Sequence, residues 1–253
     1  MRVYEAATDY GQVGSFGYDL PTLSINPMFS RERVNAWQML PPGWPEVRLP
    51  PNHIPSLECG ERFDAEALAL YPADVPVHLA NAKKYPRRLH DFLQNPLLSV
   101  SGGGRDLIEA MEPGRHQLLP HRLVDRDSSR PLYDGEQRYF LNILNYVPIS
   151  DAYDLNRPND CVTTSTGTAA PWGESPYVKI ENHRAHLEGL RMRRDAIKGL
   201  HLWRVGTFID FAEQPPRTYR GLGSGLYVTE AFRAAFHKAK LTGLHFQEVP
   251  VDG

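Results

Sequence analysis

The sequence predicts an α+β protein. We expect a mixed or antiparallel sheet, two similar strand–helix–strand units and a proline-rich, irregular N-terminal cap. Hydrophobic residues make up 41% of the 253-residue chain and charged residues 23%, so a core of useful size is available. The 22 prolines and 20 glycines indicate many turns and exclude an all-helical bundle. Short apolar runs of strand length alternate with helical patterns in the C-terminal part.

The first 90 residues are predicted to form the cap. Proline fixes φ and removes a backbone donor, so long regular elements cannot pass through a segment this rich in proline. We expect a short strand over residues 2–5 and a helix over residues 61–70. The remaining chain, residues 91–253, is predicted to form one compact α+β domain. The prolines of the cap that carry this prediction are Pro41, Pro42, Pro45, Pro50, Pro51, Pro55, Pro72 and Pro76.

From residue 97 the pattern becomes regular. LLSVS reads as a short buried strand, GGGRDLIEAME as a helix that ends before Pro113, and RHQLLPHRLV as a further strand. RYFLNILNYVPI is the clearest strand, because Tyr139 and Leu141 alternate with Arg138 and Asn142. This alternation predicts one apolar and one polar face.

The later segments are less uniform. CVTTSTGTAAPWGESP is rich in threonine and serine and is predicted to be a polar loop. A strand is expected near residues 177–180, a polar and helical segment over 188–197, and a strand in LHLWRVGTFIDF. The final segment, residues 225–251, is expected to form a strand, a helix, a turn and a strand.

A weak internal repeat relates two segments of the chain at a constant offset of 128 residues, Leu98 to Leu226. In each copy a short apolar strand ends in a hydroxyl residue, which is a natural helix N-cap, and a helix follows. The repeat therefore predicts two similar units packed on one mixed sheet. The first copy contains Leu98, Val100, Ser101 and Arg105, and the second contains Leu226, Val228, Thr229 and Arg233.

Charge and hydropathy restrict the partners and the location. The net charge of −2 provides no global field for nucleic acid or an anionic membrane, so neither partner is expected. No run of eighteen apolar residues and no N-terminal secretory pattern occurs. A cytoplasmic location is expected. In a reducing cytosol Cys59 and Cys161 are expected to be thiols, and a single disulfide between them is the alternative.

The motifs that could carry chemistry have simpler interpretations. SGGGR at residues 101–105 lies between a strand and a helix and could hold an anion, but it lacks the lysine and spacing of a P-loop. His183 and His186 form an HxxH pair, whereas a zinc site needs three or four ligands. We therefore predict no catalytic residues, no metal site and no cofactor.

Two charge runs stand out. Between Glu58 and Asp74, five acids accompany one base, and between Lys179 and Arg204, seven bases accompany three acids. Most such runs are solvated faces. The alternative is electrostatic docking to a protein partner, because complementary charge speeds association and disfavours wrong partners.

Two blocks of the sequence carry a resemblance to a known family. The chain resembles the bacterial polymorphic-toxin immunity family numbered eleven, formerly a domain of unknown function, in the first block LLSVSGGGRDLIEAMEPGRHQLLPHRLVDRDSSRPLYDGEQRYFLNILNYVPISDAYDLNR and in the closing block LHLWRVGTFIDF followed by LYVTEAFRAAFHKAKLTGLHFQEV. The resemblance covers residues 97–250. Its most specific part is the V-T-E-x-F pattern, a helix and then L-T-G-L-x-F. One departure is SGGGR, which replaces the family's serine–glutamate helix opening.

The resemblance implies a binding protein that neutralises a cognate toxin and transforms no substrate. The family supplies no catalytic residues to carry over. Two alternatives remain open: a hydrolytic or nucleotide-processing enzyme, and a structural subunit of a secretion assembly. Aromatic and arginine residues of irregular regions are the expected partner-binding candidates, because such residues dominate protein interfaces. They are Trp37, Trp44, Trp172, Tyr177, Arg191, Arg193 and Arg194.

Overall fold

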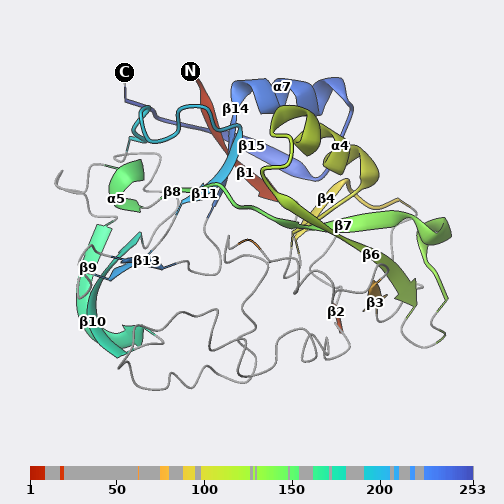
Figure 1. The fold of residues 1–253 in the computed structure, drawn as a ribbon, viewed down its shortest axis with the longest axis horizontal. Helices are drawn as coiled ribbons and strands as arrows, with labels where there is room; N and C mark the ends of the chain where they lie inside the picture. Colours follow the sequence, from red (N-terminus) through yellow and green to blue (C-terminus); the bar gives the residue numbers. More distant parts are fainter. Residues whose placement is uncertain are drawn as a thin grey trace.

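The described residues of the computed structural model contain a five-stranded sheet, a six-stranded sheet and two helices of nine or more residues, so the predicted α+β class is confirmed. The expectation that the two repeat-related units share one mixed sheet is wrong, because each unit lies in its own sheet. Helices α4 (Gly102–Met111) and α7 (Glu230–Lys238) lie together against the sheets (Figure 1). The structure describes residues 1–8, 18–19, 62, 75–79, 88–94, 98–125, 128, 130–147, 149–153, 162–170, 173–180, 191–205, 208–210, 217–219 and 225–252.

The first strand of the chain lies inside the five-stranded sheet. β1 runs antiparallel to both of its neighbours, β14 and β15, which come from the opposite end of the sequence. The predicted N-terminal strand is therefore confirmed, and it is longer than expected. The order of the sheet is β15 (Leu244–Val249), β1 (Val3–Thr8), β14 (Leu226–Thr229), β11 (Leu202–Val205) and β8 (Tyr146–Val147).

The six-stranded sheet includes part of the proline-rich region. β3 contains Pro76 and pairs in parallel with β6, so residues 75–79 are regular structure. The domain boundary near residue 90 stays a prediction. The order of this sheet is β2 (Tyr18–Asp19), β3 (Val75–Leu79), β6 (Gln117–Asp125), β7 (Gln137–Asn142), β5 (Leu98–Val100) and β4 (Phe92–Gln94).

Two hairpins complete the described strands. β9 (Val162–Ala170) pairs with β10 (Gly173–Ile180), and β12 (Phe208–Asp210) pairs with β13 (Arg217–Tyr219). The expected polar loop over residues 161–176 is therefore wrong for most of its length. Its threonines are β-branched, and β-branched side chains favour strands even where the composition is polar.

The clearest predicted strand is two strands in two different sheets. RYFLNILNYVPI divides into β7 and β8, and β8 lies in the five-stranded sheet. Its polar face is also covered, because Arg138 is 1% exposed and Asn142 is fully buried. Because these polar side chains are buried, the alternation in β7 does not mark a solvent-exposed face.

Two further expectations need correction. LHLWRVGTFIDF also splits, into β11 and β12, which belong to different sheets. The helix expected over residues 188–197 is absent from its described part, because residues 194–199 form turns. The predicted helix at 61–70, apart from Arg62, lies outside the described residues. So do Cys59, Cys161, His183 and His186.

Both predicted helices are confirmed together with their N-caps. The Ser101 hydroxyl accepts a hydrogen bond from the backbone N–H of Gly104 at 3.2 Å, at the start of α4. The Thr229 hydroxyl accepts one from the N–H of Phe232 at 3.3 Å, at the start of α7. Each cap satisfies a backbone donor that the helix itself leaves unpaired. Within the described residues, no helix is long and apolar enough to span a membrane.

The strand pairings around the two helices have the same register. Helix α4 joins β5 to β6, and β7 lies between these strands and is antiparallel to both. Helix α7 joins β14 to β15, and β1 lies between them in the same way. Val100 lies opposite Tyr139, and Val228 lies opposite Tyr4, which preserves the 128-residue offset.

One hydrophobic core serves both helices. Phe232 and Phe236 of α7 and Leu107 and Ile108 of α4 belong to a single cluster with residues of both sheets. A second cluster surrounds the fully buried Trp203. Burying a Leu, Ile or Phe side chain contributes roughly 1.5–3 kcal/mol, so the shared cluster holds the two sheets together.

The L-T-G-L pattern after α7 attaches the C-terminal segment to residues 90–92. Thr242 donates hydrogen bonds from its N–H and its hydroxyl to the Asp91 carboxylate, both at 2.9 Å. At the next position φ is +98°, and a Cβ on Gly243 would lie 2.2 Å from the Phe92 carbonyl oxygen. Only glycine fits this close approach of two backbones.

Candidate functional site

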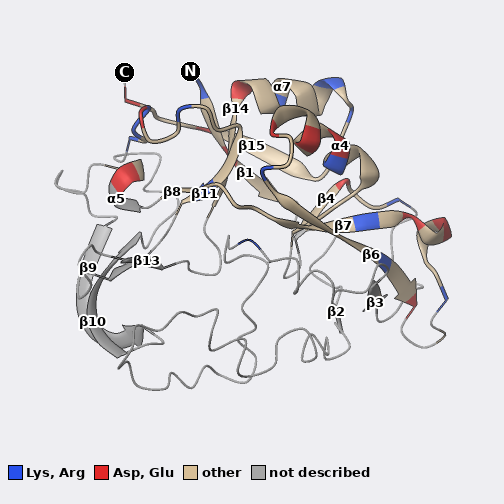
Figure 2. Ribbon diagram, viewed as in Figure 1, with Lys and Arg blue, Asp and Glu red and all other residues tan. Residues whose placement is uncertain are grey.

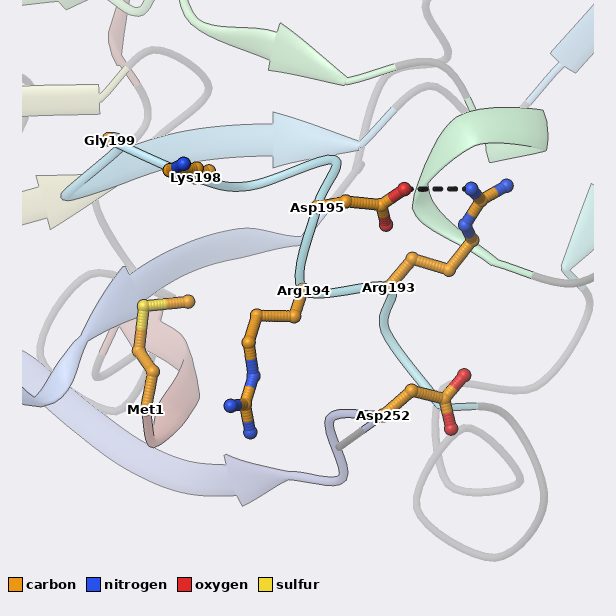
Figure 3. A pocket seen from close by; sticks show the side chains of 7 residues that line it. All are labelled: Met1, Arg193, Arg194, Asp195, Lys198, Gly199 and Asp252. Carbon is orange, nitrogen blue, oxygen red and sulfur yellow. Dashed lines mark hydrogen bonds and ion pairs between the residues drawn. The ribbon is translucent and has the colours of Figure 1, made fainter.

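An open pocket of about 630 Å³ lies where both ends of the chain meet the segment 191–200. We call this segment the basic loop. Figure 2 shows its lysine and arginine residues close to the two chain ends. The residues that line the pocket, drawn in Figure 3, are Met1, Arg193, Arg194, Asp195, Lys198, Gly199 and Asp252.

The basic loop is attached to the core by two buried side chains. Met192 and Ile197 are both fully buried in the cluster around Trp203. The N–H of Met192 donates to the Pro250 carbonyl at 2.9 Å, and the N–H of Asp252 donates back to the Met192 carbonyl at 2.9 Å. These contacts fix the loop against the C-terminal segment.

Backbone hydrogen bonds also fix the rest of the basic loop. The N–H of Arg193 donates to the Ala152 carbonyl at 2.8 Å, and the N–H of Leu200 donates to the Ile197 carbonyl at 3.2 Å. Gly199 has φ +79°, a left-handed conformation that allows the chain to turn back into β11. The exposed charges of the loop are therefore presented on a fixed backbone.

The charges on the loop differ in their partners. Arg193 forms an ion pair with Asp195 at 2.8 Å, and both side chains are largely exposed. The hydrogen bond from Arg193 lowers the pKa of Asp195. Arg194 and Lys198 form no ion pair among the residues that the structure describes, and both are exposed. These two cations are open to a partner.

Three of the seven residues predicted from sequence to bind a partner lie on the basic loop. Arg193 and Arg194 line the pocket, and Arg191 is exposed at the start of the loop. Tyr177 lies in β10 opposite Ser165. The tryptophans Trp37, Trp44 and Trp172 lie outside the described residues.

The run of basic residues between Lys179 and Arg204, noted in the sequence, does not form one continuous surface. Arg204 is 3% exposed and belongs to β11, so the run ends in the core. The pocket instead includes Met1 and Asp252, which sequence reasoning missed. No local pattern could have found them, because only the pairing of β1 with β15 brings the two chain ends together.

A serine–histidine pair in the six-stranded sheet resembles a nucleophile and its base. The Ser99 hydroxyl lies 3.1 Å from Nε2 of His121, and Arg138 donates to the same hydroxyl at 3.2 Å. Burial, together with the charge of Arg138, lowers the pKa of His121 to about 3. Ser99 is 1% exposed and His121 fully buried, so no substrate could reach them here. This cluster stabilises the sheet.

A second buried cluster joins α4 to β11. The Glu112 carboxylate accepts hydrogen bonds from Asn145 Nδ2 at 2.8 Å and from the N–H of His201 at 2.7 Å. It also accepts from Nε2 of His116, whose Nδ1 accepts the N–H of Leu144 at 3.2 Å. Because every contact is internal and Glu112 is 2% exposed, this cluster is structural.

The start of α4 already has an intramolecular carboxylate beside it. The Ser101 hydroxyl donates to Asp91 at 2.7 Å, and Asp91 is held in place by Thr242. The SGGGR segment is therefore a capped helix start. Among the described residues, no group of three histidine, cysteine, aspartate or glutamate side chains is arranged to hold a metal ion.

Comparison with known families relates this chain to an immunity family. The model of Imm11, described as an immunity protein family, matches residues 26–251. This match begins well before residue 97, so the family likeness includes most of the proline-rich region. No curated protein matches the chain.

Proposed function

Because the chain belongs to the Imm11 immunity protein family, we propose that it binds and neutralises a cognate secreted antibacterial toxin. The family match over residues 26–251 is the observation that carries this proposal. Membership of an immunity family suggests an inhibitory role, not a catalytic one. The toxin would be an effector of a polymorphic toxin system used in interbacterial competition, for example one delivered by type VI secretion.

Neutralisation would occur by occlusion of the toxin's active site. Stable protein complexes of this kind bury about 1,600 Å² in total, and a few buried anchor residues supply most of the affinity. The fixed backbone and exposed arginines of the basic loop support such a role, because they offer anchors that need little rearrangement. We place the protein in the cytoplasm, where it would meet the incoming toxin.

Co-expression with the toxin encoded by the adjacent gene tests this function. The toxin alone should stop growth when it is produced in the cytoplasm, and co-expression of this protein should restore growth. The two proteins should also co-purify as a stoichiometric complex. A toxin of a different locus serves as the control and should not be neutralised. Continued killing at equal expression of both proteins would contradict the proposal.

A further inference from the structure

We propose that the rim of the pocket formed by Met1, Arg194 and Lys198 is the surface that holds the toxin, through a carboxylate-bearing segment of that toxin. This inference rests on the proposed function and names the contact surface within it. Three observations carry it: the charges around the pocket, the exposed apolar side chain of Met1 and the fixed backbone of the basic loop.

The balance of charge at the pocket favours carboxylates. Among the described residues that line the pocket, three carry basic side chains (Arg193, Arg194 and Lys198) and two carry carboxylates (Asp195 and Asp252). Arg193 is already engaged by Asp195 at 2.8 Å. Arg194 thus offers a guanidinium whose donor geometry matches a carboxylate with two parallel hydrogen bonds, and Lys198 offers a second positive charge.

Met1 supplies an apolar contact beside these cations. Its side chain is 51% exposed, and it is the one large hydrophobic residue that is exposed among the described residues. Figure 3 shows Met1 and Arg194 extending from neighbouring segments at the same pocket. Methionine and arginine are both enriched at the centres of protein interfaces, where an apolar contact excludes water from the ion pair.

The fixed backbone lowers the cost of binding. Ordering a flexible loop opposes association, and each immobilised long side chain costs a further ~0.5–1.5 kcal/mol. In the basic loop, Met192 and Ile197 are buried and the backbone is hydrogen-bonded to Pro250 and Ala152. On this surface, the exposed side chains of Met1, Arg194 and Lys198 remain to be ordered. This arrangement suits a tight complex.

A protein partner fits this surface better than nucleic acid does. A phosphate backbone carries continuous negative charge, which Asp195 and Asp252 at the pocket would repel. The chain as a whole carries a net charge of −2, so it provides no global positive field that would attract nucleic acid. A short acidic segment of a protein can instead place its few carboxylates against Arg194 and Lys198, away from Asp195 and Asp252.

The experiment compares two charge-reversal variants of the full chain. The test variant is Arg194→Glu with Lys198→Glu. The matched control is Arg115→Glu with Arg130→Glu, two exposed arginines in the connections before and after β6 and outside the basic loop, which changes the net charge equally. Affinity for the purified toxin domain of the adjacent gene is measured by calorimetry at about 0.15 M NaCl. Thermal unfolding verifies that both variants fold.

We expect the test variant to bind at least about tenfold more weakly than the wild type, and the control to stay within about threefold. The salt dependence of association should also be shallower for the test variant. Wild-type affinity in the test variant would overturn this surface while leaving the proposed function intact. A wild type that does not bind the toxin would contradict the function and this surface together. Binding of a roughly 20-bp DNA duplex that the test variant abolishes would assign the surface to nucleic acid instead.

Discussion

Tyr4 and Tyr139 occupy the same position in the two sheets. Tyr4 lies opposite Val228. The guanidinium of Arg233 lies over the Tyr4 ring, and its Cζ is 4.7 Å from the ring centroid. Tyr139 lies opposite Val100 and beneath Arg105 at 5.0 Å. The middle strand of the first unit follows its neighbours in sequence, whereas the middle strand of the second is the N-terminal strand of the chain. β1 therefore completes the unit formed by β14, α7 and β15, which begins at Leu226.

This relationship predicts that β1 can be moved to the other end of the chain. Removal of residues 1–8 should prevent folding, because a buried central strand is lost. Appending the same eight residues after Gly253 through a short glycine–serine linker should restore a wild-type melting temperature, since Val3 already pairs with Val249. Circular dichroism during heating measures both variants. A scrambled copy of the appended segment is the control, and rescue by that copy would refute the strand's specific role.

Gly243 should tolerate no side chain. In Gly243→Ala the added Cβ would lie 2.2 Å from the Phe92 carbonyl oxygen, at a φ of +98°. We expect a loss of at least about 3 kcal/mol in the free energy of unfolding, measured with urea. Gly114→Ala is the matched control, because Gly114 has φ +65° but open space around it. It should lose only about 1 kcal/mol, and equal losses would refute the steric argument.

The hydroxyl of Thr229 should stabilise α7. It caps the N–H of Phe232 and lies 2.9 Å from Nδ1 of His201. Thr229→Val keeps the shape of the side chain but removes the hydroxyl, so it should cost about 1–2 kcal/mol. Thr229→Ser retains the hydroxyl and should recover most of this loss. Chemical denaturation compares the three proteins, and equal stability of the Val variant and wild type would contradict the cap.

Glu112 should make stability depend on pH. Burial acts to raise the pKa of Glu112, but hydrogen bonds from His116 and the N–H of His201 outweigh it and hold the pKa below the ordinary 4.5. A lowered carboxyl pKa stabilises the fold above about pH 4.5, and this contribution is lost as the pH falls through the folded-state pKa. Glu112→Gln should therefore be about 1.5–3 kcal/mol less stable at pH 7.

The difference between wild type and Glu112→Gln should shrink as the pH is lowered from 5 toward 3, because the wild-type carboxyl then becomes neutral. Melting temperatures across this range measure it. Asp134→Asn is the control, since Asp134 is exposed and lies outside the cluster around Glu112, and it should follow the wild type at every pH. A gap between wild type and Glu112→Gln that is independent of pH would show that packing, not charge, explains the loss.

Sequence patterns located the elements around the two helices well. A hydroxyl residue after a short apolar strand predicted both N-caps, because capping depends on residues that are adjacent in the chain. The same local reasoning failed for RYFLNILNYVPI. Its alternation is real, but Arg138 is buried and donates to Ser99 and to the His90 carbonyl, which local patterning cannot reveal.

The sequence by itself determined the α+β class, the two capped helices, the family resemblance and the arginines of the basic loop. Only the tertiary structure decided that β1 lies between β14 and β15 in the five-stranded sheet and that Arg204 is buried. It also decided that Met1, Arg194 and Lys198 line one pocket. The physical reason is the distance in sequence over which each kind of interaction acts. Helix caps and strand propensity act between residues close in sequence, whereas sheet pairing and burial join segments that lie far apart in it.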